Sequence, residues 1–199
     1  QTGITVNSGA ATHFGVIGYA NPTSAGVSHT FTVTALDAAN NTAAGYRGTV
    51  HFTSSDSAAN LPADYSFTAG DNGVRSFNLA FATVGTRAIT VTDTVNASVT
   101  GSQAGILVNP GTATHFAVTG YPNPTVSGVA HGLTVTALDA NNNTATGYLG
   151  TVHFSSSDPS AVLPGDFTFT ILNSGAEGFT ITLNTAGTHT ITVTDTVTA

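Results

Sequence analysis

The chain contains no cysteine, no methionine and no tryptophan, and Glu177 is its single glutamate. Without cysteine, disulfides, thiolate metal ligands and thiol nucleophiles are all excluded. Lysine is absent as well, so the basic residues are three arginines, Arg47, Arg75 and Arg87. With a formal net charge of −7, the chain offers no basic patch. We therefore expect neither nucleic acid nor an anionic membrane surface as a partner.

Long apolar runs are also missing, so the sequence predicts no transmembrane helix, no membrane insertion and no retained signal peptide. A chain without methionine cannot begin at its own initiator. We therefore expect either a removed secretory signal or an excerpt from a longer protein. Charged residues make up only 7% of the chain, whereas apolar residues make up 40%, enough for packed cores. The composition favours a secreted, extracellular protein at the cell surface.

What the chain does contain is a long internal repeat. His13 matches His115, Tyr19 matches Tyr121 and Asp37 matches Asp139, always at the same spacing, and more than half of the aligned positions are identical. The sequence therefore predicts two copies of one unit of about 100 residues.

Each copy alternates apolar residues with threonine, as in Phe31-Thr-Val-Thr-Ala35 and Ile191-Thr-Val193. A period of two with β-branched and aromatic residues is typical of strands, and it leaves no room for helices. The strands expected in copy one are 13–17, 29–37, 48–54, 64–68, 74–82, 86–95 and 99–108, with six counterparts in copy two. The predicted fold class is all-β, with two tandem immunoglobulin-like β-sandwiches over 10–109 and 112–199.

Several runs resemble the tandem bacterial Ig-like repeats of large secreted and cell-surface proteins. They include Val135-Thr-Ala-Leu-Asp139, Gly150-Thr-Val-His-Phe154 and Gly187-Thr-His-Thr-Ile-Thr-Val193. This resemblance covers nearly the whole chain. It implies a spacer, stalk or adhesive array outside the cell, without catalysis and without a catalytic residue to assign.

The nine leading residues, Gln1-Thr-Gly-Ile-Thr-Val-Asn-Ser-Gly9, recur as Gln103-Ala-Gly-Ile-Leu-Val-Asn-Pro-Gly111. In the middle of the chain they form the last strand of copy one, and copy two lacks this strand. We therefore expect residues 1–9 to act as a donor strand that completes the second sandwich of another molecule. The predicted donor residues are Gly3, Ile4, Thr5 and Val6. The predicted acceptor residues are Thr190, Ile191, Thr192, Val193 and Thr194.

Such donor-strand complementation would join molecules head to tail into a pilus-like filament, with the protein itself as partner. The alternative is a fragment of a long covalent Ig-like array, acting as an adhesin, stalk or carbohydrate-binding module. Four tyrosines beside glycine or proline suggest packing between adjacent modules: Tyr19, Tyr46, Tyr121 and Tyr148.

Other chemistry has weaker support. The histidines lack zinc spacing, and the loops that begin at Asp37 and Asp139 resemble turns more than calcium sites, so no cofactor is expected, with calcium the one ion considered. Asp56, Asp93 and their counterparts in copy two are interpreted as turn acids, and no enzyme activity is expected. Acceptor patterns for glycosylation begin at Asn40, Asn96 and Asn142.

Overall fold

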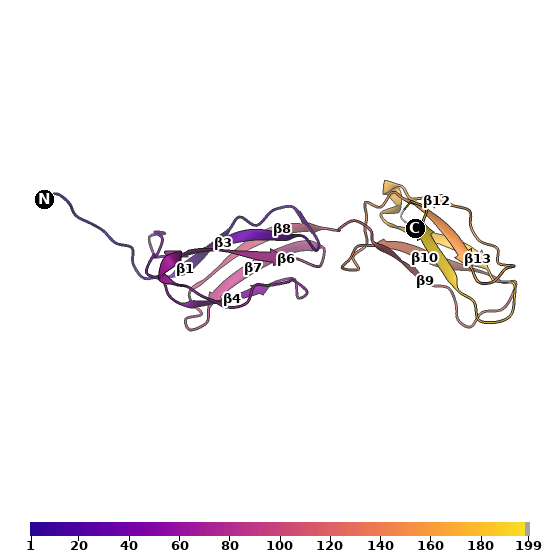
Figure 1. The fold of residues 1–199 in the computed structure, drawn as a ribbon, viewed down its shortest axis with the longest axis horizontal. Helices are drawn as coiled ribbons and strands as arrows, with labels where there is room; N and C mark the ends of the chain where they lie inside the picture. Colours follow the sequence, from indigo (N-terminus) through magenta and orange to yellow (C-terminus); the bar gives the residue numbers. More distant parts are fainter. Residues whose placement is uncertain (198–199) are drawn as a thin grey trace. The chain divides into compact units, whose positions relative to one another are not determined.

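The computed structural model describes residues 1–197, and strands dominate it (Figure 1). The chain divides into two compact units, unit 1 over Gln1–Asn109 and unit 2 over Pro110–Ala199. The last two residues of the predicted second domain lie outside the described residues. The predicted all-β class with Ig-like sandwiches is confirmed.

Unit 1 is made of two sheets that enclose one core. Its strands are β1 (His13–Ile17), β2 (Thr23–Ser24), β3 (Ser28–Leu36), β4 (Thr49–Ser54), β5 (Tyr65–Ser66), β6 (Val74–Ala80), β7 (Gly85–Asp93) and β8 (Thr100–Asn109). One sheet has the order β1-β3-β6, and the other has the order β2-β8-β7-β4-β5. The last strand, β8, therefore lies inside its sheet, between β7 and β2.

Alternation of side chains builds this core. Along β3, Phe31, Val33 and Ala35 are buried, whereas the threonines between them are partly exposed. In β4, Phe52 is buried and the neighbouring His51 faces solvent, as the period of two predicts. The predicted strand bounds differ from the observed ones mainly at the ends, where hydrogen bonding to a partner decides the assignment.

Unit 2 repeats the arrangement with fewer strands. They are β9 (His115–Thr119), β10 (Ala130–Leu138), β11 (Thr151–Ser156), β12 (Phe167–Thr168), β13 (Ala176–Thr182) and β14 (Ile191–Asp195). The sheets have the orders β13-β10-β9 and β12-β11-β14. Within the described part of unit 2, neither β2 nor β8 has a counterpart, so β14 forms an edge of its sheet.

The prediction that the chain has no helix is wrong in one detail. Two short 3-10 turns occur at Ala69–Asp71 and Ile171–Asn173. Their last residues accept the backbone N–H of Thr68 at 2.6 Å and of Thr170 at 2.7 Å. Such local side-chain bonds offer the backbone an alternative to the sheet ladder. Across residues 1–197, no helix is both long and apolar enough to cross a bilayer.

The prediction for the tyrosines is also wrong in unit 1. Tyr19 is buried in the core, and its hydroxyl donates to the carbonyl of Leu79 at 3.1 Å. Tyr46 packs edge-on against Phe14 and Phe67, with ring centroids 5.4 and 5.1 Å away. These rings therefore stabilise their own sandwich. The adjacent glycine and proline reflect the loops that carry the tyrosines.

Candidate strand-acceptor site

The candidate site is a sheet edge of unit 2. In unit 1 the corresponding edge, that of β7, is covered by β8. This strand pairs antiparallel with β7 and parallel with β2, so both of its edges are hydrogen-bonded. Ile106 lies opposite Arg87, and Val108 lies opposite both Gly85 and Thr23. Ile106 and Val108 are 0% and 2% exposed. They close one side of the core of unit 1.

Two side-chain amides fasten β8 to the loop that follows β1. The amide of Gln103 accepts the N–H of Tyr19 and donates to its carbonyl, both at 3.0 Å. The amide of Asn21 donates to the carbonyl of Gly105 at 3.0 Å and accepts the N–H of Leu107 at 2.9 Å. Each amide satisfies one backbone donor and one backbone acceptor, as a rung of a β-ladder does. We call these two contacts the amide clamps.

A β-bulge separates the two clamps. The register of β7 on β8 shifts between Arg87 and Ile89. Between these two pairs β7 has one residue, whereas β8 has two, residues 104 and 105. Gly105 lies in this bulge with φ of 72°. A positive φ is readily adopted only by glycine, so this position constrains the sequence of any strand that fits here.

In unit 2 the corresponding edge is open. Ile89 and Val91 of unit 1 are fully buried, whereas their counterparts Ile191 and Val193 in β14 are only partly buried. The N–H of Ser157 donates to the carbonyl of Thr190, which directs the backbone of Thr190 toward β11. Backbone groups alternate along an antiparallel strand, so those of Ile191 and Val193 face the open edge. Such an edge is a template for another strand.

A cavity of about 170 Å³ lies next to the residues that lead into β14. It is lined by Thr125, Ser127, Leu183, Thr185, Ala186, Gly187 and His189. Thr125 and Gly187 correspond to Thr23 and Gly85, the two residues that flank Val108 in unit 1. By the repeat, the cavity of unit 2 corresponds to the place of the buried Val108 in unit 1. We call the open edge of β14 together with this cavity the acceptor groove.

Two buried hydroxyls of unit 2, one of them in the lining of the cavity, are unsatisfied. Within residues 1–197, Tyr121 Oη and Thr125 Oγ1 have no hydrogen-bond partner. Tyr121 is partly buried, whereas its counterpart Tyr19 is only 3% exposed and donates to Leu79. A buried hydroxyl without a partner is destabilising. The core of unit 2, as far as the structure describes it, therefore satisfies its polar groups less well than the core of unit 1.

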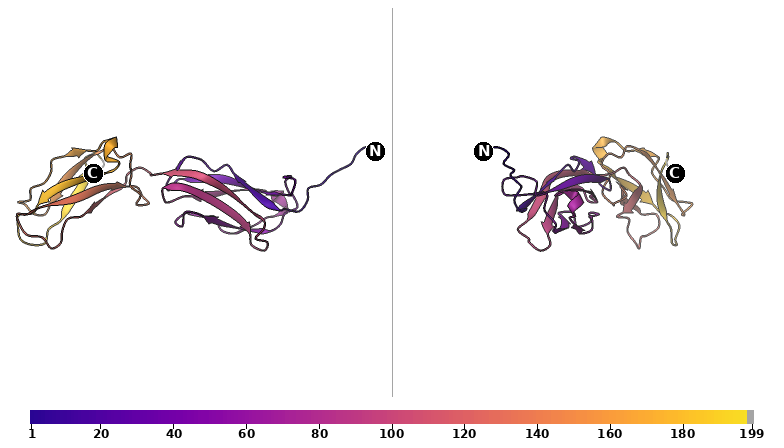
Figure 2. Two further views of the ribbon diagram at one scale, coloured as in Figure 1. Left: turned by 180° about the vertical axis from the view of Figure 1, so that it is seen from behind. Right: turned by 60° about the vertical axis from the view of Figure 1, so that its left-hand side comes forward.

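The predicted donor residues lie in a segment without strand structure. Figures 1 and 2 show residues 1–8 running clear of the sheets of unit 1. Ile4 and Val6 are 68% and 88% exposed, although they match the buried Ile106 and Val108. Gly3 has φ of 79°, close to the value at Gly105. The predicted acceptor residues Ile191–Thr194 lie in β14, and Thr190 directly precedes it.

Residues 1–8, which we call the donor segment, are anchored where they lead into unit 1. Asp37 Oδ2 accepts the N–H of Gly9 at 2.8 Å, and Oδ1 accepts those of Ala39 and Asn41, both at 2.9 Å. The bond from Gly9 contributes most to lowering the pKa of Asp37 to about 2. In unit 2, Asp139 binds Gly111 in the same way at 2.9 Å.

The loop considered for calcium is thus a hydrogen-bonded turn. Among the described residues no three His, Asp or Glu side chains are grouped as metal ligands.

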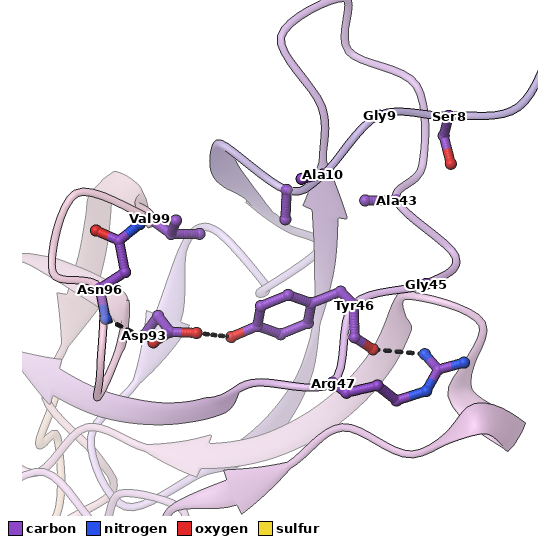
Figure 3. Close-up of a pocket in the computed structure, with 11 residues that line it drawn as sticks. Ser8, Gly9, Ala10, Ala43, Gly45, Tyr46, Arg47, Asp93, Asn96 and Val99 are labelled. Atoms are coloured by element: carbon purple, nitrogen blue, oxygen red, sulfur yellow. Dashed lines mark hydrogen bonds between the residues drawn. The ribbon is translucent and has the colours of Figure 1, made fainter.

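An open pocket of about 480 Å³ lies beside this anchor in unit 1 (Figure 3). Figure 3 shows the hydroxyl of Tyr46 pointing at Asp93, which it meets in a short hydrogen bond. Asp93 also accepts the N–H of Asn96 at 2.8 Å. Burial and the bond to Asp93 raise the pKa of Tyr46, so the proton stays on the phenol. Both oxygens of the carboxylate accept hydrogen bonds that hold the following loop, in line with the interpretation of Asp93 as a turn acid.

Asp56 and Asp158 also hold loops. Asp56 accepts the N–H groups of Ala82 and Thr83 at 2.8 and 2.9 Å and the hydroxyl of Thr83 at 2.6 Å. Asp158 makes the equivalent bonds in unit 2. One recurring contact that the sequence pattern did not predict is an exposed pair at 2.7 Å between His51 and Asp64, repeated by His153 and Asp166. Exposed pairs of this kind contribute little to stability.

These features define the class of the protein as a tandem immunoglobulin-like β-sandwich protein. Similar solved structures include the Escherichia coli adhesin FdeC, with a TM-score of 0.51 and 20% identity over 94% of this chain and 61% of FdeC. Invasin, a bacterial integrin-binding protein, has a TM-score of 0.40 and 21% identity over 92% of this chain and 36% of its own. The Yersinia pseudotuberculosis adhesin InvE has a TM-score of 0.41 and 19% identity, over 88% and 53%.

The chain thus spans less than two thirds of each of these three structures. No protein-family model and no curated protein sequence matches it. At these identities the likeness to FdeC supports the fold, namely Ig-like repeats of the kind seen in bacterial adhesins.

Proposed function

We propose that this is an extracellular structural protein whose molecules join by strand donation. Residues 1–8 of one molecule occupy the acceptor groove of unit 2 in the next. One observation carries the proposal. Unit 2 has an open edge and a cavity where unit 1 holds β8, and the leading segment of the chain repeats the sequence of β8.

The driving force is the burial of two exposed apolar side chains. In the groove, Ile4 and Val6 would take the places that Ile106 and Val108 hold in unit 1. Burying side chains of this size contributes roughly 1.5–3 kcal/mol each. The backbone of the donor strand adds ladder hydrogen bonds to the edge formed by the start of β14 and the residues before it, each worth about 1 kcal/mol net. Among the described residues, 1–8 belong to no strand and so have no ladder hydrogen bonds to lose.

The contact is heterologous, since the donor segment and the acceptor groove are different surfaces of the same chain. Repetition of a heterologous contact gives an open filament unless the rotation closes a ring. Head-to-tail assembly of this kind is a form of β-strand addition, in which main-chain bonds give affinity and pockets give specificity.

A second candidate function is a stalk segment within a longer adhesin-like array. It is favoured by the likeness to FdeC, which carries the fold across 94% of this chain. In that case the acceptor groove takes its strand from the same covalent array. Both functions use the same groove, and they differ in whether the strand joins separate molecules.

Deletion of residues 1–8 tests the proposal. We expect the full chain to form filaments in negative-stain electron microscopy, and the deletion variant to remain monomeric in sedimentation velocity. A peptide of residues 1–9 should bind the deletion variant and shorten filaments of the full chain. Filaments that persist in the deletion variant would refute the proposal. A full chain that stays monomeric, while the deletion variant binds the peptide, would favour the stalk.

A further inference from the structure

Strand donation as proposed leaves one question open, namely how the groove recognises its strand. Alternating apolar residues are common in this chain, as in β3 and β10. Alternation alone excludes a slip by one residue, because that slip turns every side chain to the other face. It does not exclude a slip by two residues, which would place Val6 where Ile4 belongs.

Unit 1 shows a device that can exclude such slips. The two amide clamps contact Gln103, Gly105 and Leu107 at fixed positions along β8. The bulge requires glycine at Gly105. A strand moved by two residues would lose both clamps and would place a side chain at the bulge. These contacts therefore depend on register, whereas the ladder bonds do not.

Unit 2 keeps the acceptor half of this device. Tyr121 and Asn123 occupy the positions of Tyr19 and Asn21. Asn123 is exposed, and its side chain makes no hydrogen bond among residues 1–197. The amide that fastens β8 in unit 1 is thus present in unit 2 without its strand.

The leading segment keeps the donor half. Gln1 occupies the position of Gln103, and Gly3 has the positive φ of Gly105. Thr5 matches Leu107 and supplies the backbone N–H that Asn123 can accept. The segment therefore carries the clamp residue, the bulge glycine and both apolar residues at the spacing found in β8.

Resting on the proposed function, we infer that the acceptor groove reads its strand in a single register, fixed by Asn123 and by the pattern Gln-x-Gly-Ile-x-Val of residues 1–6. The Gln1 amide bonds the backbone of Tyr121, and Asn123 bonds the backbone of Gly3 and Thr5. Val6 fills the cavity beside Thr125.

This register also sets the partners along β14 and the turn before it. From the pairing of β7 with β8, Val6 lies opposite Gly187, Thr5 opposite Thr188 and Ile4 opposite His189. Gln1 lies opposite Ile191 across the bulge. Thr192, Val193 and Thr194 consequently extend beyond the first residue of the donor. The donor strand therefore lies mainly alongside residues 187–190, which precede β14, and Gln1 alone lies opposite a residue of β14 itself.

The first test measures binding of a labelled peptide of residues 1–9 to the deletion variant by fluorescence anisotropy. Asn123→Ala removes two hydrogen bonds to the peptide and should weaken binding roughly 30-fold. The matched control is Asn21→Ala, which removes the same amide from unit 1 and should leave the peptide affinity within about twofold. The peptide with Gly3→Val should bind worse than the peptide with Thr2→Val.

A second test reads the register directly and does not depend on affinity. Because the chain has no cysteine, a peptide with Thr5→Cys can form a disulfide only at an introduced site. The inferred register predicts rapid oxidation with Thr188→Cys, since directly opposed residues fit disulfide geometry. Thr190→Cys serves as the control for a two-residue slip.

The outcomes are distinguishable. If the unmodified peptide does not bind at all, strand donation itself fails. If it binds but Asn123→Ala has no effect, or if Thr190→Cys oxidises as fast as Thr188→Cys, the single register is overturned and strand donation stands.

Discussion

Replacing Ile4 with alanine should separate assembly from folding. In the free chain Ile4 is 68% exposed, so its truncation leaves both sandwiches intact. Under the proposed strand donation it would take the place of Ile106, which is fully buried. The same substitution should thus leave the stability of the monomer nearly unchanged and weaken the binding of residues 1–8 to the acceptor groove.

The magnitude follows from the burial of Ile106. Truncating a buried isoleucine to alanine costs about 2–5 kcal/mol, through lost burial and the cavity that remains. The association constant should therefore fall roughly 30-fold or more. The mean length of a linear polymer varies as the square root of this constant, so filaments should become at least about fivefold shorter at the same concentration.

Sedimentation velocity measures this length distribution, and thermal unfolding monitored by circular dichroism checks the fold. Two control variants frame the result. Thr5→Ala changes a position whose counterpart, Leu107, is 46% exposed, and it should leave filament length unchanged. Ile106→Ala should lower the melting temperature of unit 1 by roughly 8 °C or more. If Ile4→Ala gave filaments of normal length, Ile4 would not be buried at the joint, and the reasoning would fail.

Three further predictions concern the sandwiches themselves. The folded-state pKa of Asp37 is depressed to about 2, so its stabilising contribution is present above its ordinary pKa of 3.8 and lost as pH falls toward 2; the fall in melting temperature between pH 4 and pH 2 should be smaller in Asp37→Asn than in the unmodified chain. The pKa of Tyr46 is raised by burial and by Asp93, so its contribution is present below pH 10 and lost above it; Tyr46→Phe should flatten the loss of stability measured in urea above pH 10. A Cβ at Gly48 would collide with the Tyr46 hydroxyl and the Asp93 carboxylate, so Gly48→Ala should destabilise unit 1 by about 1–3 kcal/mol, whereas Gly45→Ala, which meets open space, should be nearly neutral in the same denaturation assay.

Much of the fold follows from sequence because its signals are local and repeated. Alternation in β3 and β4 fixes which residues face the core, and the duplicated pattern indicates which strand of unit 1 has no counterpart in the described part of unit 2. The short β2 was harder to predict, since only its pairing with β8 defines Thr23–Ser24 as a strand. Its counterpart in unit 2 has no such partner among the described residues, and the same sequence pattern forms no strand there.

The clamps were missed for a different reason. Gln103 and Asn21 act through side chains that reach backbone 84 to 86 residues away, and no local periodicity reports such contacts. A signal did exist in the repeat, because glutamine recurs at Gln1 and asparagine at Asn123. The error over Tyr19 has a similar origin, since neighbouring glycine and proline indicate a loop but not the direction of a side chain.

The position of β8 inside its sheet has a mechanical consequence. Because β7 and β2 both pair with it, a strand in this position is hydrogen-bonded along both of its edges. A tensile load applied along its axis shears both sets of bonds together, whereas a load on an edge strand could peel one set open rung by rung. A thread held by such strands would therefore resist stretching better than its modest binding energy suggests.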